Sequence, residues 1–176
     1  MKTVVSSFFS LVALLLISNT LKAQDVNIVK IDSVSGKEML VGAITREGLQ
    51  IMGTWFDEEY NAYIPDSSAI KILEENRNIL PDIFVVLGTW CGDSREHVPH
   101  FYKIIDLAGY PEEKVFAVSV DRLKKGGDFC LTDFEITLVP TFILSRNGSE
   151  IGRIIETPEI SIEQDMVNFI TSSNNQ

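Results

Sequence analysis

The residues best suited to covalent chemistry are Cys91 and Ser94, which lie in the segment TWCGDSREH. An apolar run ends just before Cys91, and a helical pattern begins just after it. Free backbone N–H groups and the helix dipole favour an anion at a helix start, so this position favours a thiolate. A thiolate is the nucleophile of disulfide exchange. The Ser94 hydroxyl, one turn into the helix, could donate a hydrogen bond to the sulfur but could not form a disulfide.

Two charged neighbours act on Cys91 in opposite directions. Asp93 suits the start of a helix, but its negative charge disfavours a neighbouring thiolate. Arg95 offsets part of that effect. The sequence leaves the balance open, and it equally allows Cys91 to be an ordinary half-buried cysteine.

Cys130 is the second of the two cysteines. A disulfide needs Cα atoms about 4.4–6.8 Å apart, and the sequence does not fix that distance. If the two cysteines are close, Cys130 could serve as a resolving thiol, or the pair could form one structural disulfide. We favour a third interpretation, in which Cys130 is a small buried residue between Phe129 and Leu131.

The only histidines, His97 and His100, lie three residues apart on the predicted helix, downstream of Cys91 and Asp93. At 1.5 Å rise per residue, Cys91 and His97 are about 9 Å apart, so the ligands of a metal would converge only around a bend at Pro99. We therefore predict a surface helix face here, with no metal and no other cofactor.

The elements that must hold Cys91 alternate between strands and helices. Buried strands are predicted at 83–88 and 114–120, because both segments are continuous apolar runs rich in β-branched residues. A helix is predicted between them, ending at Gly109. This crossover implies that the two strands are parallel.

Shorter elements follow the second strand. A short helix or helical turn is predicted over 128–136, and a hairpin with an Asn-Gly turn over 141–155. An amphipathic helix over 161–170, capped by Ser161, ends the pattern. The order predicts an α/β fold with a mixed central sheet flanked by helices.

The N-terminal part has a weaker pattern. Residues 24–66 are predicted to form a helical extension, in which Thr45 caps a helix that runs to about Phe56. A turn and helix cap at 65–67 start the main domain, and residues 172–176 are expected to be a frayed tail.

Residues 1–23 have the pattern of a secretory signal peptide, with Lys2, an apolar core at 8–17 and small Ala23 before the expected cleavage point. The core is shorter than the ~20 apolar residues of a spanning helix, and an uncleaved anchor is the alternative. We expect an exported protein, periplasmic or secreted, with no membrane insertion after cleavage.

The charge disfavours some classes of partner. The 176-residue chain has a net charge of −10. Without Lys2 and Lys22, 13 basic and 25 acidic residues remain, a net charge of −12. Surfaces that bind nucleic acids or anionic membranes are basic, so we expect neither partner.

The segment WCGDS resembles the Trp-Cys-Gly-Pro-Cys site of thioredoxins, in the same strand-to-helix setting. Three further family features recur in order: Pro99 in the following helix, Pro140 at the place of a cis-proline, and Gly148 in the hairpin turn. The resemblance covers roughly residues 67–171, which it identifies as a thioredoxin-like domain. It is closest to the exported bacterial TlpA/ResA-like group.

The resemblance implies a role for each matching position. Cys91 would be the attacking thiol of a CxxS motif, and Trp90 would lie beside the sulfur. Substrate would bind along Trp90, Val139, Pro140 and Thr141, with the Val139 backbone holding an extended peptide.

Two departures from the family alter the expected activity. Ser94 replaces the resolving cysteine, and Val85 replaces the buried acid that lies six residues before the attacking thiol. We therefore predict an oxidoreductase or isomerase that forms mixed disulfides with thiol- or disulfide-containing proteins through Cys91. A second substrate thiol, a small thiol or Cys130 would release them. The alternative is a redox-inactive peptide-binding module, and the sequence does not identify an upstream redox partner.

Overall fold

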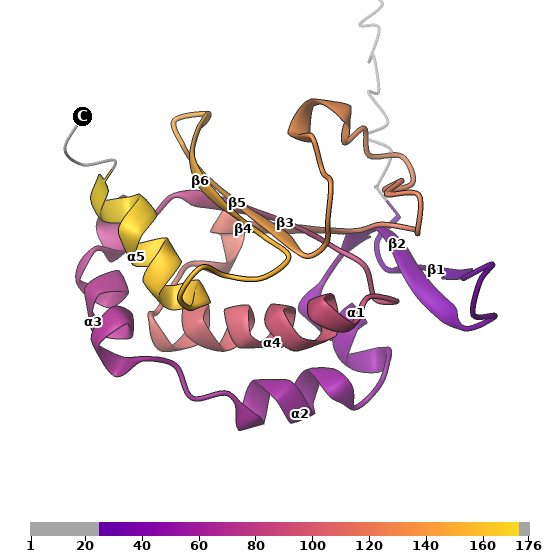
Figure 1. The fold of residues 1–176 in the computed structure, drawn as a ribbon, viewed down its shortest axis with the longest axis horizontal. Coiled ribbons are helices and arrows are strands. Elements are labelled where there is room, and N and C mark those ends of the chain that lie inside the picture. The colour runs from indigo at the N-terminus through magenta and orange to yellow at the C-terminus, as the bar shows by residue number, and fades with distance from the viewer. Residues whose placement is uncertain (1–24, 173–176) are drawn as a thin grey trace, which may run out of the picture.

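Apolar runs form the centre of a mixed six-stranded sheet in the computed structural model, which describes residues 25–172 (Figure 1). The strand order is β1-β2-β4-β3-β5-β6. The two central strands pair in parallel, as the crossover predicts, and all other neighbours pair antiparallel. The predicted signal peptide and nearly all of the predicted frayed tail lie outside the described residues.

The described residues contain strands, α-helices and short 3-10 helices. The strands are β1 (Ile28–Ile31), β2 (Glu38–Ile44), β3 (Asp82–Leu87), β4 (Val115–Ser119), β5 (Thr141–Arg146) and β6 (Ser149–Ile155). The α-helices are α1 (Arg46–Ile51), α2 (Trp55–Ala62), α3 (Ser67–Glu75), α4 (Gly92–Leu107) and α5 (Ile162–Ser172). The 3-10 helices are η1 (Arg77–Ile79), η2 (Glu112–Lys114) and η3 (Thr132–Phe134). None of the helices in 25–172 is long and apolar enough to cross a membrane.

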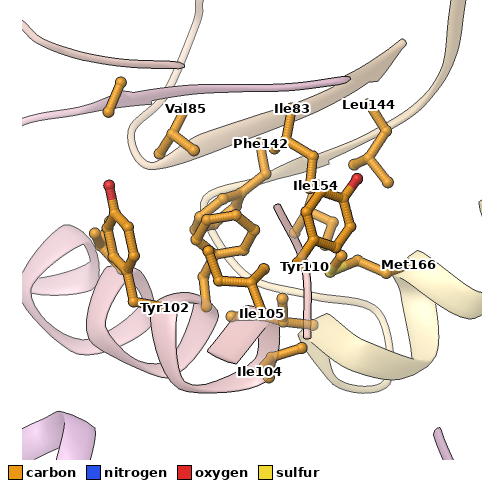
Figure 2. Close-up of a cluster of buried hydrophobic side chains, with 14 of the residues drawn as sticks. Ile83, Val85, Tyr102, Ile104, Ile105, Tyr110, Phe142, Leu144, Ile154 and Met166 are labelled. Carbon is orange, nitrogen blue, oxygen red and sulfur yellow. The ribbon is translucent and has the colours of Figure 1, made fainter. Parts of the chain in front are cut away.

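The helices gather on one face of the sheet and bury the larger core there (Figure 1). Alternate residues of β3 face this core, and Val85 is fully buried in it. Figure 2 shows Val85 and Phe142 from the sheet, Ile105 from α4 and Met166 from α5 around the same space. This packing fixes α4, and therefore its N-terminal end, against the sheet.

The opposite face of the sheet has a smaller core covered by an irregular segment, residues 121–140 (Figure 1). Its fully buried members include Val86 and Val118, with Leu131 and Val139 supplied by the covering segment. Among residues 25–172, no α-helix contributes a side chain to this cluster. The predicted helical turn in this segment is the 3-10 helix η3.

The N-terminal extension differs from its prediction. It is helical only from α1 onward, because β1 and β2 precede α1 and β2 pairs with β4 in the main sheet. Thr45 caps α1, as predicted, by accepting a hydrogen bond from the Gly48 N–H. The helix then stops at Ile51 instead of running to Phe56, because Gly53 has a φ of 145°. α2 starts only after that break.

The other local predictions are confirmed by specific hydrogen bonds and dihedral angles. The turn at 65–67 caps α3 through Asp66, which accepts from two backbone N–H groups. Asn147 and Gly148 have φ values of 52° and 77°, the left-handed pair that a two-residue hairpin turn requires. Ser161 accepts a hydrogen bond from Gln164 N at the start of α5.

Candidate active site

Cys91 is the N-cap residue of α4, immediately after the turn that leaves β3. Its backbone N–H donates to Gly88 O at 2.8 Å, and its carbonyl accepts from Arg95 N at 3.2 Å. These bonds fix the residue at the junction of strand and helix. The thiol is free and partly exposed.

The thiol of Cys91 faces the loop before β5. Its Sγ lies 3.2 Å from the carbonyl oxygen of Val139, and the Val139–Pro140 peptide bond is cis. The Thr141 hydroxyl donates to Leu138 O at 2.7 Å, which closes the same loop. The structure therefore brings the thiol against Val139, in the loop of the three buried residues Val139, Pro140 and Thr141 that are predicted to bind substrate.

A carboxylate also contacts the sulfur. Asp93 Oδ2 lies 3.6 Å from Sγ, so the protonated thiol can donate to it. Arg95, predicted to offset this charge, donates instead from Nε to Thr89 O at 2.7 Å. Asp93 is thus the charged side chain in hydrogen-bonding contact with the thiol.

Ser94 has a structural partner. Its side chain is fully buried, and its Oγ accepts a hydrogen bond from Gly88 N at 3.2 Å. The hydroxyl therefore satisfies the backbone of the turn before Cys91, a contact that the sequence prediction did not include.

Two contacts hold the indole ring of Trp90, one at its nitrogen and one on its face. The indole N–H donates to Val120 O at 2.8 Å, and the Arg122 guanidinium carbon lies 4.8 Å from the ring centroid. The ring also lies close over Gly88, where an added Cβ would be 2.7 Å from it. Trp90 therefore packs against these three residues, directly before Cys91, and remains partly exposed.

Sequence reasoning missed Arg122 and its partner Asp32, whose side chains form an ion pair. One signal was available for Arg122, because it comes shortly after β4, and site residues gather at the carboxyl ends of parallel strands. No sequence signal pairs it with Asp32, which lies 90 positions earlier.

Two curated proteins are similar to this chain over part of its length. No family model matches the chain. The chain is 29% identical over 94 residues to mitochondrial thioredoxin-3 of Saccharomyces cerevisiae, covering 53% of this chain and 67% of that protein. It is 26% identical over 121 residues to thioredoxin H2-2 of Oryza sativa subsp. japonica, covering 68% and 76%. At this level of identity, the chain is similar to thioredoxins.

One solved structure has a fold similar to that of this chain. A Pseudomonas aeruginosa protein of unknown function superimposes with a TM-score of 0.50 and 13% identity, covering 72% of this chain and 84% of that chain. The mixed sheet with flanking helices is thus the thioredoxin-like fold that the motif order predicts.

Cys130 of this thioredoxin-like protein is exposed, so the prediction of a small buried residue is wrong. It is also free, and no disulfide joins it to Cys91. Its Sγ lies 3.4 Å from Oγ1 of Thr132, and hydrogen bonding to Thr132 lowers the pKa of Cys130 below its ordinary value. A resolving role for Cys130 stays a prediction.

His100 does not lie on a surface helix face. Its ring stacks on Tyr63 with centroids 4.0 Å apart, and its Nε2 lies 3.2 Å from Oε2 of Glu59. Burial lowers the pKa of His100, and Glu59 opposes that effect. His97 lies beside it, and residues 25–172 contain no group of three or more His, Cys, Asp or Glu that could hold a metal ion.

Proposed function

We propose that this thioredoxin-like protein exchanges disulfides through one thiol, that of Cys91. The observation that carries the proposal is the placement of its Sγ at the start of α4, 3.2 Å from the carbonyl before cis-Pro140. The helix start favours the thiolate. The relation to thioredoxins suggests a thiol–disulfide redox role.

The reaction needs no external electron donor. The Cys91 thiolate attacks one sulfur of a substrate disulfide, a new S–S bond forms, and the other substrate sulfur leaves as a thiolate. A second substrate thiolate then attacks the mixed disulfide and releases Cys91. The numbers of disulfides and thiols are unchanged, so the net reaction is isomerisation.

Ser94 gives the mixed disulfide a long life. It has no sulfur to attack the adduct, and its buried hydroxyl accepts from Gly88. Release therefore depends on a substrate thiol, on a small thiol, or on the exposed Cys130. Such a protein should rearrange disulfides better than it reduces them.

The loop before β5 supplies a docking point for the substrate backbone. The carbonyl of Val139 accepts from the thiol in the resting state. Once the thiol loses its proton, that carbonyl has no donor, and a substrate N–H can take its place. The partly exposed Trp90 adds substrate contact beside this loop, whereas Thr141 is buried and holds the loop through its bond to Leu138 O.

The cellular setting is part of the proposal. The signal-peptide pattern of residues 1–23 supports export, to a periplasm or to the medium, and the substrates would then be exported proteins with disulfides. Within the family, this setting favours the TlpA/ResA-like group.

The test is intact mass after equilibration with an oxidised small-thiol disulfide. Cys130→Ser should carry one adduct, on Cys91, and Cys91→Ser should carry an adduct only on the exposed Cys130. Loss of two hydrogens with both thiols consumed would show a Cys91–Cys130 disulfide and contradict the single-thiol mechanism. In a refolding assay with a scrambled disulfide protein, Cys91→Ser should be inactive and Cys130→Ser active. Retained activity in Cys91→Ser would contradict the proposal.

A further inference from the structure

Asp32 and Arg122, which the exchange reaction does not use, connect the β1–β2 hairpin to the turn that carries Cys91. The Arg122 Nε lies 2.9 Å from both carboxylate oxygens of Asp32, and Nη2 lies 2.8 Å from Oδ2. The Asp32 side chain is only 2% exposed. A buried carboxylate is costly unless it is paired, so this ion pair holds Arg122 in one position.

Asp32 is itself rigidly held by the hairpin turn. Its carboxylate accepts from the Val34 N–H at 3.1 Å and from the Ser35 hydroxyl at 2.6 Å. These bonds, with that from Arg122 foremost, hold the pKa of Asp32 well below its usual range. The pair therefore stays charged at neutral pH, and the guanidinium is anchored to the hairpin.

The anchored guanidinium covers the face of Trp90, 4.8 Å from the ring centroid. A guanidinium over an indole is a favourable cation–π arrangement. Because the indole N–H also donates to Val120 O, Trp90 is fixed by two residues at the end of β4.

A second link joins the hairpin to the same turn. The Leu40 N–H in β2 donates to Oγ1 of Thr89 at 3.0 Å, and Ser119 Oγ donates to Leu40 O at 2.7 Å. Both bonds are buried. The hairpin thus contacts Thr89 directly and Trp90 through Arg122, and these are the two residues before Cys91.

Three charged side chains lie on or beside the turn that carries Cys91. Asp93 contacts it, Arg95 is occupied by Thr89 O, and Arg122 stacks on the neighbouring indole. Asp32 is the main cause of the raised pKa of Arg122, and the charge of Cys91 contributes to it as well. Arg122 is thus a cation held over the residue next to Cys91, and a nearby cation favours a thiolate over a thiol.

We propose that the Asp32–Arg122 ion pair is a positioning element of the active site, through which the N-terminal hairpin fixes Trp90 and a positive charge beside Cys91 and so raises the reactivity of the thiol. This inference deepens the proposed function and rests on it. It assigns a role to the first part of the extension, for which the sequence pattern predicts none.

The first test is the alkylation rate of Cys91 across a range of pH, in a Cys130→Ser background. Loss of the positive charge in Arg122→Gln should slow alkylation at neutral pH by about three- to tenfold. Arg122→Lys keeps the positive charge but lacks the planar guanidinium, so the alkylation rate of Cys91 in this variant should be intermediate.

Arg46→Gln is the matched control. Arg46 also pairs with a carboxylate, that of Asp106 at 2.8 Å, and its guanidinium also lies over an aromatic ring, that of Tyr102 at 4.5 Å. It makes these contacts between α1 and α4, at the far end of α4 from the thiol. Its alkylation profile should match the parent, whatever the change in stability.

The second test follows Trp90 by acrylamide quenching in a Trp55→Phe background. Asp32→Asn should free the guanidinium and make the indole more accessible. Parent-like alkylation in folded Arg122→Gln, or parent-like quenching in folded Asp32→Asn, would overturn the proposal. If Arg122→Gln does not fold, Arg122→Lys and Asp32→Asn carry the test. Both readouts work without a disulfide substrate, so absence of mixed disulfides in the parent would overturn the proposed function alone.

Discussion

The Sγ of Cys91 lies 3.6 Å from Oδ2 of Asp93, so the thiol shares the first turn of α4 with a carboxylate. The contact gives the thiol an acceptor for its proton. It also places a negative charge where the thiolate must form, and the two effects can be separated by experiment.

Asp93→Asn should increase the rate of Cys91 alkylation at neutral pH. Removing one negative charge at this distance from a partly exposed sulfur favours the thiolate, by about two- to tenfold in rate. Glu96→Gln is the control, because Glu96 is exposed on the same helix and makes no such contact. A slower rate in Asp93→Asn would instead identify Asp93 as a required proton acceptor.

Ser94→Cys should convert the protein into a dithiol. Residue 94 lies three positions after Cys91 at the start of α4, on the same side of the helix. On oxidation, intact mass should show the loss of two hydrogens, and mixed disulfides should become short-lived. Ser94→Ala distinguishes loss of the hydroxyl from gain of a thiol, because it removes the acceptor of the buried Gly88 N–H without adding sulfur. Its free energy of unfolding should fall by about 1–3 kcal/mol.

Gly88→Ala should displace Trp90. An added Cβ at position 88 would lie 2.7 Å from the indole, closer than packed atoms allow. In a Trp55→Phe background, the Trp90 emission should shift and the midpoint of urea unfolding should fall. Gly92→Ala is the control, because a Cβ there would meet no atom within 4 Å. An unchanged emission in Gly88→Ala would show that the ring does not depend on this contact.

His100 should make the fold less stable in mild acid. Burial lowers the pKa of His100, so the unfolded chain binds its proton more readily than the folded chain. Stability is therefore lost as pH falls below the ordinary histidine value of about 6.5. His100→Gln should show a smaller loss than the parent between about pH 7.5 and 5.5 in urea unfolding. His97→Gln serves as the control, and an equal loss in the parent and His100→Gln would contradict the assignment.

The central elements could be predicted because their signals are local. β3 and β4 are continuous apolar runs, α4 has a regular apolar stripe, and Asn147-Gly148 specifies its turn. The meeting of Cys91 with Pro140 followed from the order of family motifs. These features depend on residues close in sequence or on a resemblance that already contains the fold.

The features that could not be predicted depend on contacts between distant parts of the chain. β2 contains Gly42, a residue type that is depleted in strands, and β2 joins the main sheet through β4, which is more than 70 residues away. Cys130 is exposed although its neighbour Leu131 is buried, because the segment is irregular just before η3 and its side chains follow no helix or strand period. His100 is covered by Tyr63, a residue of the extension that local pattern could not place.

The uneven covering of the sheet has a consequence for local opening. Helices bury one face, while the irregular segment 121–140 alone covers the smaller core on the other (Figure 1). Such a segment can detach without breaking the larger core, so its amide hydrogens should exchange with solvent much faster than those of α4. The same segment carries Arg122 and Val139, which hold Trp90 and the thiol. Each brief opening would therefore separate the sulfur from its carbonyl partner and remove the docking point for a substrate backbone, so the site is complete only while this segment is in place.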